Sequence, residues 1–372
     1  MIATDHALAT LCSELKACGA FGFDTEFIRE RSYVPQLCLI QAAPPGGRPV
    51  LVDPLEVDPQ PFWNLVLDPA VQKVVHAGEQ DLELCFRHTG RLPQNIFDVQ
   101  IAAGFVGLEY PLSYSRLVEQ LTGREVPTGS SFSEWGRRPL EPKQIAYASA
   151  DVEFLMTIRD DLAGRLAQAG RESWLAEEMA EWSAAESYEM RPEHAWLRVR
   201  GGERMRGKKL AALRELACWR EKQAERQDVP PRTCLGDDVL RRVAREKPET
   251  VDDLAALKGF PRPLARRRGK EVLAAMRRGL KTPLDRCPPQ PLSGRSGSED
   301  KPLVDALMAA GREACAAAGV SHELFGSRAG YQELVYVWKH PKQDWPAPKL
   351  IRGWRKELAG AALQHAWQRA RG

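Results

Sequence analysis

The chain reads Phe21-Gly22-Phe23-Asp24-Thr25-Glu26-Phe27 near its start, and this stretch predicts a buried strand that ends in acidic residues. Successive side chains of a strand point to opposite faces, so Asp24 and Glu26 project to the same side. Two neighbouring carboxylates repel each other unless a cation lies between them. Gly22 allows another group to approach the backbone closely. The stretch alone is equally consistent with a solvated acidic turn, so further carboxylates from elsewhere in the chain must decide between a turn and a site.

The segments around this stretch predict a mixed sheet flanked by helices. A helix is expected at 4–18, and apolar runs at 37–40 and 50–52 extend the opening strand into a meander with Pro/Gly turns. A fourth strand at 73–76 leads into a helix that contains residues 81–86. Other helical patterns cover 59–67 and 142–168. Ile96-Phe97-Asp98 opens a further helical region that continues to 105.

Strand signals largely stop after residue 191, and the remainder of the chain predicts helices. A strong amphipathic helix is expected at 207–226, with its leucines and Trp219 near one face. The segment 287–298 has the Pro/Gly/Ser-rich composition of a linker. The helical modules on its two sides have the pattern of a diverged internal repeat, with helices at 236–245, 250–257 and 261–279 before it and over 301–372 after it.

Charge is distributed unevenly along the chain. Residues 1–190 hold 15 Lys+Arg against 28 Asp+Glu, whereas residues 191–372 hold 38 against 22. An acidic part joined to a basic part suggests separate tasks, and basic modules commonly hold phosphate backbones. The alternative is that the Arg-rich helices are simply solvated faces.

Composition excludes several classes of protein. A hydrophobic content of 43% and a charged content of 28% are ordinary for a globular protein. The sequence has no apolar run of about 18 residues, and its first residues lack the basic region and apolar core of a secretory signal. The eight cysteines are scattered without a Cys-x-x-Cys pair, which argues against a zinc site or a disulfide framework. We therefore expect a cytoplasmic protein without a membrane span.

Three further acidic residues stand out. Asp81 lies near the predicted start of a helix, where the helix dipole and free amides favour a negative charge. Asp151 lies one helical turn beyond Tyr147, so the two side chains share a face. Asp98 lies where another helix begins and is expected to be its N-cap.

An acidic cluster suited to two hard divalent cations would result from Asp24, Glu26, Asp81 and Asp151. Mg²⁺ prefers oxygen ligands and keeps several waters, so it needs few carboxylates. Paired ions about 3.5–4 Å apart can activate a water and stabilise the leaving oxygen of a phosphodiester. A tyrosine with a pKa of about 10 is a poor base at neutral pH, so Tyr147 is expected to position the water.

Three segments carry these residues: Phe-Asp-Thr-Glu-Phe at 23–27, Val-His-Ala-Gly-Glu-Gln-Asp-Leu-Glu at 75–83 and Tyr-Ala-Ser-Ala-Asp-Val-Glu-Phe-Leu at 147–155. In order and spacing they resemble the three exonuclease motifs of the DEDD superfamily. A tyrosine four residues before the last aspartate marks the DEDDy branch. The DEDDh branch has a histidine five residues before it, where this chain has Ala146. Nearly the whole chain resembles the bacterial ribonuclease D family.

The resemblance implies an α/β ribonuclease-H-like exonuclease domain followed by two all-α helical domains of the helicase-and-RNase-D C-terminal (HRDC) type. The implied boundaries are 1–190 for the exonuclease domain, 191–281 and 301–372 for the HRDC-type domains, and 282–300 for the linker. The implied reaction is 3′→5′ hydrolysis of RNA with release of nucleoside 5′-monophosphates. Its typical role is to trim tRNA precursors with 3′ extensions. We expect a monomer that needs no nucleotide cofactor and does not associate with a membrane.

The resemblance also implies roles for the acidic residues. Asp24 would bridge two divalent metal ions, Mg²⁺ or Mn²⁺. Glu26 and Asp151 would hold the ion that activates water, and Asp81 would serve the second ion directly or through water. Tyr147 would orient the nucleophile.

Contacts with RNA are expected from both parts of the chain. Phe27 and Gln41 are candidates for contacts with the terminal nucleotide. Residues 191–281 hold 25 Lys+Arg against 13 Asp+Glu, compared with 13 against 9 in residues 282–372, so the first module is expected to hold the RNA body through phosphates. The candidate basic residues are Arg206, Lys208, Lys209, Arg266, Arg267 and Arg268. A solvated helix face is the alternative for the last three, and Trp354 and Trp367 are expected in the core.

One segment departs from the family pattern. Family members usually carry a lysine-containing loop and Ser/Thr-Asp-Trp before the Trp135 position, whereas this chain has Glu134 before Trp135 and no lysine between residues 125 and 134. Because the four carboxylates are intact, we expect the chemistry to be retained. We expect the departure to affect substrate binding near this loop or the rate of hydrolysis.

Two other functions remain open at this point. A DNA-directed 3′→5′ exonuclease would use the same acidic cluster, and HRDC-type modules also occur in DNA helicases. A non-catalytic nucleic-acid-binding scaffold would keep the fold without the reaction, although the intact carboxylates argue against it.

Overall fold

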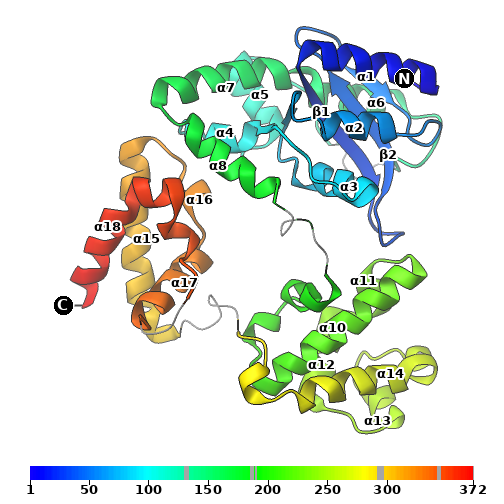
Figure 1. Ribbon diagram of the computed structural model, residues 1–372, viewed down its shortest axis with the longest axis vertical. Helices are drawn as coiled ribbons and strands as arrows, with labels where there is room; N and C mark the ends of the chain where they lie inside the picture. Colours follow the sequence, from blue (N-terminus) through cyan, green and yellow to red (C-terminus); the bar gives the residue numbers. More distant parts are fainter. Residues whose placement is uncertain (130–133, 185–187, 189–190, 291–296, 342–344, 372) are drawn as a thin grey trace.

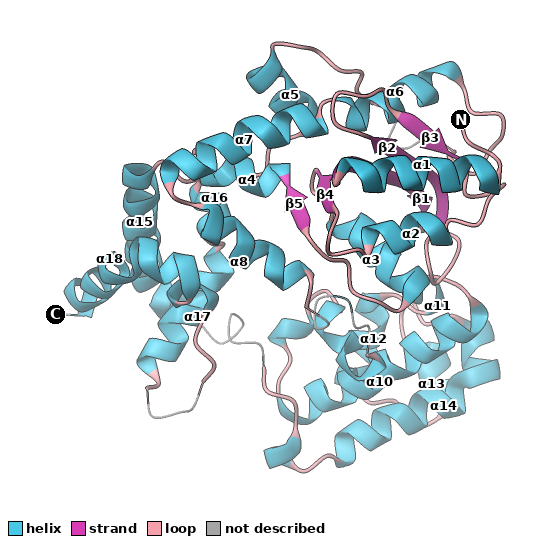
Figure 2. Cartoon of the chain, turned by 45° about the horizontal axis from the view of Figure 1, so that its top comes forward, coloured by secondary structure: helices cyan, strands magenta, loops and turns pink. Residues whose placement is uncertain are grey.

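The chain forms an N-terminal α/β domain and two helical modules in this computed structural model (Figure 1). The structure describes residues 1–129, 134–184, 188, 191–290, 297–341 and 345–371. Figure 2 shows the strands of these residues confined to the N-terminal domain, with helices elsewhere. The departure from the family pattern therefore falls partly outside the described residues, at 130–133. No helix among the described residues is long and apolar enough to cross a membrane.

A mixed five-stranded sheet forms the centre of the N-terminal domain, in the order β3-β2-β1-β4-β5. The first three strands form the antiparallel meander that the sequence predicts, and β4 and β5 continue the sheet in parallel. The strands are β1 (Ala20–Ile28), β2 (Gln36–Ala43), β3 (Val50–Val52), β4 (Gln72–Val75) and β5 (Ile96–Asp98).

The structure corrects one expectation for this sheet. Residues 96–98 do not open a helix but form β5, which pairs with β4 through three residues. A strand of three residues is too short to show a period, and its hydrogen bonds come from a partner distant in the sequence. The helix α4 (Val99–Phe105) begins directly after it, and Asp98 is its N-cap, as the sequence predicts. The backbone N–H groups of Gln100 and Ile101 donate to Asp98 Oδ1 at 2.8 and 3.1 Å.

Helices cover both faces of the sheet. Phe21 and Phe23 point towards α2 (Gln60–Val66) and pack edge-on against Phe62. Gly22 points to the opposite face, where a Cβ atom would lie 2.8 Å from the Cβ of Leu155, so glycine lets the helix approach the strand. The remaining helices of the domain are α1 (Asp5–Cys18), α3 (Glu79–Thr89), α5 (Tyr114–Thr122), α6 (Pro142–Glu153), α7 (Leu155–Ala169) and α8 (Glu172–Trp182). The helical pattern at 142–168 is thus divided at Phe154.

The first helical module has a hydrophobic core of its own. The leucines and Trp219 of the predicted amphipathic helix are buried in it, together with apolar residues of α12 and α14. Its elements are the 3₁₀ helices η1 (Pro192–Arg198) and η2 (Gly202–Arg204) and the helices α10 (Gly207–Gln227), α11 (Pro231–Cys234), α12 (Asp237–Glu246), α13 (Val251–Ala256) and α14 (Arg262–Lys281).

The second helical module shares its core with the N-terminal domain. Trp354 is buried, packs edge-on against Phe105 at 4.8 Å and stacks on Trp174 at 5.6 Å between ring centroids. Trp367 is also buried, so both tryptophans are core residues as predicted. Figure 1 shows α8 beside this module. Its elements are α15 (Lys301–Ala318), α16 (His322–Phe325), α17 (Arg328–Lys339), the 3₁₀ helix η6 (Lys349–Ile351) and α18 (Gly353–Arg371).

A buried ion pair reinforces this shared core. Arg355 of α18 donates to the Glu178 carboxylate of α8 and to the carbonyl oxygens of Phe325 and Leu324, at 2.7 and 3.0 Å. The indole N–H of Trp354 donates to the same carboxylate at 2.7 Å. Because both charges are buried, each depends on the other for its stability in the interior.

Candidate active site

Three carboxylates converge at the end of the opening strand. One ligand oxygen from each of Asp24, Glu26 and Asp151 lies within 4.8 Å of the others. Strand alternation puts Asp24 and Glu26 on the same side of β1. The helix α6 packs on this side and contributes Asp151. The group therefore joins one local pair of acids to a third that is distant in the sequence.

Asp81 adds a fourth carboxylate beside this group. It lies in the first turn of α3 and is buried, and the hydroxyl of Thr25 donates to its Oδ1. Thr25 lies between Asp24 and Glu26 on β1, so its side chain points to the opposite face of the strand. The hydrogen bond to Asp81 is therefore made from that face. The Asp81 charge nevertheless contributes to the raised pKa of Asp24. Asp81 does not belong to the 4.8 Å group among the described residues.

The pKa values of the four acids are raised. Burial raises the pKa of Glu26 to about 9, with further contributions from Asp151 and Asp81. Burial raises the pKa of Asp151 to about 7 and that of Asp81 to about 6. The pKa of Asp24 lies well above its ordinary value because of burial and then the charges of its three neighbours. The cluster therefore favours a positive charge at its centre.

Oxygen-ligand chemistry fits this cluster. Carboxylates are the protein groups that Mg²⁺ and Mn²⁺ prefer, and several raised carboxyl pKa values at one place mean that no protein cation neutralises the group fully. The eight cysteines are free, and none belongs to the acidic group. The residues present therefore suit hard divalent cations.

Tyr147 lies against the cluster from α6. Its hydroxyl lies near the Asp151 carboxylate, and this interaction lowers the Asp151 pKa against the effect of burial. The Tyr147 pKa is itself raised, first by burial and then by the charge of Asp151, so the phenol keeps its proton at neutral pH. The ring of Trp135 packs against Tyr147 with centroids 6.2 Å apart.

Arg138 anchors the segment that carries Trp135. Its guanidinium donates to both oxygens of the buried Asp53 carboxylate, with Nη2 at 2.7 Å from Oδ1. It also donates to the carbonyl oxygens of Trp135 and Cys38, at 2.7 and 2.6 Å. This network fixes Trp135 beneath Tyr147. Sequence reasoning missed it because the pairing joins residues 85 apart.

Gln41 is fully buried directly opposite Asp24 in the β1–β2 register. Opposed residues on an antiparallel pair share a face of the sheet. Neither amide atom of Gln41 has a hydrogen-bond partner among the described residues, although buried polar groups are normally satisfied. Its amide is thus available to a water or ligand at the cluster. Phe27 is half-buried, with the Arg29 guanidinium 4.9 Å from its ring centroid.

His76 and Tyr114 support the site from behind. The Nε2 atom of His76 lies 2.9 Å from the Leu112 carbonyl oxygen, and its ring packs edge-on against Tyr114. The Tyr114 hydroxyl accepts a hydrogen bond from the Phe154 N–H group at 3.0 Å. Burial and then the charges of Asp151 and Asp24 raise the Tyr114 pKa. Sequence reasoning missed Tyr114 because no motif contains it.

The predicted basic residues lie at two places in the first module. Arg206, Lys208 and Lys209 are exposed at the start of α10, about 30 Å along this helix from Asp228, which follows its last turn and contacts the N-terminal domain. Residues 266–268 are exposed on α14, where Arg268 pairs with Glu271 at 2.7 Å. The structure does not bring either group to the acidic cluster. Arg29, which sequence reasoning did not single out, lies nearer to the acidic cluster, since its charge lowers the pKa of Asp81.

Three family models match successive parts of the chain. A 3′-5′ exonuclease model covers residues 1–167, an HRDC domain model covers residues 209–276, and a model for the C-terminal HRDC domain of ribonuclease D covers residues 301–363. All four acidic residues of the cluster lie within the first range.

Curated relatives match over almost the full length. The chain is 35% identical over 373 residues to ribonuclease D of Pseudomonas paraeruginosa, with 99% of this chain and 97% of the relative covered. It is 33% identical to ribonuclease D of Escherichia coli, with 99% and 98% covered. The crystal structure of Escherichia coli RNase D, described as an exoribonuclease involved in structured RNA processing, superposes with a TM-score of 0.85 at 32% identity and covers 99% of this chain and 98% of that one.

Proposed function

Since the chain belongs to the ribonuclease D family and is a 3′→5′ exoribonuclease, we propose that it hydrolyses the 3′-terminal phosphodiester of RNA with two divalent metal ions. The observation that carries the proposal is the convergence of Asp24, Glu26 and Asp151 within 4.8 Å. The same family membership favours an enzyme over the non-catalytic scaffold.

The four carboxylates are the proposed ligands of the two ions. Asp24, whose pKa is raised by the charges of the other three acids, would contribute to holding both ions. Glu26 and Asp151 would hold one ion, and Asp81, to which the Thr25 hydroxyl donates, would help to hold the other. Bound there, Mg²⁺ or Mn²⁺ supplies the charge that ionises a water and stabilises the leaving oxygen. The products are nucleoside 5′-monophosphates.

Neighbouring side chains position the reactants. Tyr147 keeps its proton, and its hydroxyl can form a hydrogen bond with the attacking water, so it orients the water without acting as a base. The unpartnered amide of Gln41, opposite Asp24 on β2, and the ring of Phe27, next to Glu26 on β1, contact the terminal nucleotide or the waters beside it.

We propose precursors of tRNA with 3′ extensions as the cellular substrates of a monomeric, cytoplasmic enzyme. Family membership supports the RNA class, and the basic balance of residues 191–281 supports a grip on a structured RNA body through phosphates. The basic residues at 206–209 and 266–268 are the proposed contacts for that body. The free state of all eight cysteines suits a reducing compartment.

The experiment compares two substrates at equal concentration with Mg²⁺ or Mn²⁺: a tRNA with a short 3′ extension and a single-stranded DNA of the same extension sequence. We expect stepwise release of nucleoside 5′-monophosphates from the RNA 3′ end and much slower release from DNA. Faster degradation of the DNA would identify the chain as a DNA-directed exonuclease.

A further inference from the structure

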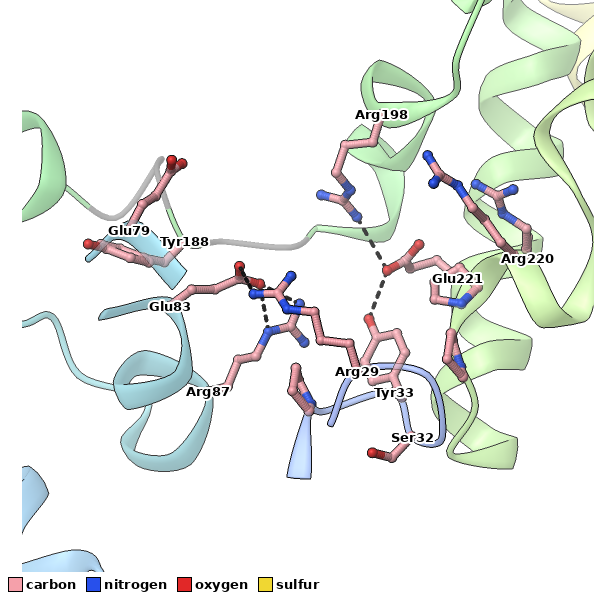
Figure 3. Close-up of a pocket in the computed structure, with 14 residues that line it drawn as sticks. Arg29, Ser32, Tyr33, Glu79, Glu83, Arg87, Tyr188, Arg198, Arg220 and Glu221 are labelled. Atoms are coloured by element: carbon pink, nitrogen blue, oxygen red, sulfur yellow. Dashed lines mark hydrogen bonds and ion pairs between the residues drawn. The ribbon is translucent and has the colours of Figure 1, made fainter. Parts of the chain in front are cut away.

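A cavity of about 520 Å³ lies in the seam between the N-terminal domain and the first helical module. Figure 3 shows its walls: Arg29, Tyr33, Glu83 and Arg87 come from the N-terminal domain, and Arg198 and Glu221 come from the first module. Five arginines and three glutamates line it. Its charged side chains therefore carry an excess of positive charge.

A hydrogen-bonded bridge sets the spacing of the two walls. The Tyr33 hydroxyl donates to Glu221 at 3.0 Å, and the Tyr33 N–H group donates to Asp228 Oδ1 at 3.0 Å. Both acceptors lie at the C-terminal end of α10. Glu221 is almost completely buried, so this bridge orients the first module on the N-terminal domain.

Two of the five arginines are fixed in the structure. Arg87 is nearly buried and donates to Glu83 through Nε at 2.8 Å, with Nη2 also within 2.8 Å of the same oxygen. Arg220 is buried and donates to Asp237 at 2.7 Å and to the Leu235 carbonyl at 2.9 Å. These arginines are structural, because each is largely shielded from solvent and depends on its acidic partner there.

The other three arginines are loosely held. Arg29 lies 3.7 Å from Glu83 and its side chain is 41% exposed. Arg198 lies 3.3 Å from Glu221 and is 44% exposed, and Arg232 lies 3.2 Å from Asp237 and is 57% exposed. The guanidinium ends of these pairs are exposed, so a phosphate can approach each arginine as a partner. If the arginine turns to a phosphate, Glu83 and Asp237 each retain a fixed arginine, and Glu221 retains the hydrogen bond from the Tyr33 hydroxyl.

The cavity begins beside the acidic cluster. Arg29 follows Glu26 by three residues, and its charge lowers the pKa of Asp81. Its guanidinium also lies over the ring of Phe27. Glu79 and Glu83, which line the cavity, flank Asp81 on α3. A chain that leaves the cluster past Arg29 thus meets Arg198 and Arg232 on the facing wall.

We propose that this seam is a binding site for the phosphodiester backbone of single-stranded RNA, with Arg29, Arg198 and Arg232 holding successive phosphates of the segment that precedes the terminal nucleotide. The proposal rests on the proposed function of the acidic cluster. Guanidinium groups suit it because their planar fork binds phosphate oxygens in pairs. The contacts carry no base information, so the site holds any sequence.

The test measures kcat/KM with Mg²⁺ on an RNA dinucleotide and on an unstructured RNA of about eight nucleotides, a length that spans a single-strand site. The seam variant is Arg198→Gln/Arg232→Gln. The matched control is Arg165→Gln/Arg328→Gln, which removes the same charge from arginines that are 44% and 46% exposed, paired with acids and outside the cavity.

We expect the seam variant to lose at least tenfold in kcat/KM on the longer RNA while hydrolysing the dinucleotide at the wild-type rate. The slope of log affinity against log salt should become shallower by about 1.4, since each single-strand phosphate contact contributes about 0.7. The control variant should match the wild type on both RNAs. Arg198→Lys/Arg232→Lys keeps both charges and should recover most of the loss.

Equal activity of the seam and control variants on the longer RNA would overturn the proposal. An equal loss on both RNAs would also overturn it, because it would indicate damage to the cluster or the fold. Failure of the proposed function would look different, since wild-type protein would then release no monophosphate from either RNA.

Discussion

Tyr147 lies beside Asp151, which follows it by one turn of α6 and whose carboxylate lies within 4.8 Å of those of Asp24 and Glu26. The phenol therefore has a fixed place beside the cluster. Trp135 packs against its ring and Arg138 holds Trp135, so the position of the hydroxyl depends on a chain of three contacts.

Tyr147→Phe should lower kcat by about ten- to a hundredfold, as is typical when a group that orients a site is removed. Metal binding should persist, because all four carboxylates remain. Rapid-quench hydrolysis and metal titration by calorimetry measure the two effects separately. A wild-type kcat in this variant would contradict the proposed role of Tyr147 in positioning the water.

Arg138→Lys should lower kcat by about tenfold, because a lysine cannot bond both oxygens of Asp53 and the two carbonyls at once. The loosened Trp135 should become more exposed to water and shift its fluorescence to longer wavelength. Its neighbour Arg137 is exposed and provides the matched control, Arg137→Lys, which should behave as wild type. Unchanged rate and fluorescence in Arg138→Lys would contradict the anchoring role.

Metal binding should depend steeply on pH. In the metal-free protein burial raises the pKa of Asp151 to about 7 and of Glu26 to about 9, so both carry protons over part of the neutral range. Binding of Mg²⁺ must displace those protons, and its affinity should rise with pH through this window. Calorimetry at pH 7 in two buffers with different ionisation enthalpies should detect proton release. Binding without proton release would contradict the assignment of these residues as ligands.

The same pKa values predict how the stability of the metal-free protein varies with pH. The folded pKa values lie above the unfolded values of about 4, so the folded state binds more protons between them. The free energy of unfolding should therefore fall as pH rises from about 5 to about 9. Asp151→Asn removes one such group and should lose less stability over this range. An equal or greater loss in that variant would contradict the prediction.

The buried pair of Glu178 and Arg355 should govern how the second helical module is held. Glu178→Gln leaves the Arg355 charge buried without a counterion and should lower the free energy of unfolding by about 3–5 kcal/mol, measured by urea denaturation. The double variant Glu178→Leu/Arg355→Met removes both charges and should recover most of the loss. A double variant as unstable as the single one would show that the pair itself, not the unpaired charge, sets the stability.

The sequence predicts those parts of the site that depend on local periodicity. Strand alternation gives the shared side of Asp24 and Glu26, and helical spacing gives the shared face of Tyr147 and Asp151. The meander, the helices and the Asp98 cap follow from local patterns in the same way. The strand β5 was missed because three residues show no period, and its identity depends on pairing with β4.

Contacts between distant parts of the chain could not be predicted. Tyr33 and Glu221 are 188 residues apart, and Glu178 and Arg355 are 177 apart. Neither pair belongs to a local pattern, because each forms only when distant segments of the chain pack together. For the same reason, local charge singles out Lys208 and Lys209 at the start of α10, whereas Arg198 and Arg232 line the seam at its other end.

The central claim is that the Asp24 cluster hydrolyses RNA from the 3′ end with divalent metal ions. The most direct measurement is the release of nucleoside 5′-monophosphates from RNA with Mg²⁺ or Mn²⁺ by the wild type, Asp24→Ala and Asp151→Ala, with RNA binding measured in parallel. We predict release by the wild type and none by either variant, while both variants still bind RNA. Wild-type turnover in either variant, or no release by the wild type, would contradict the claim.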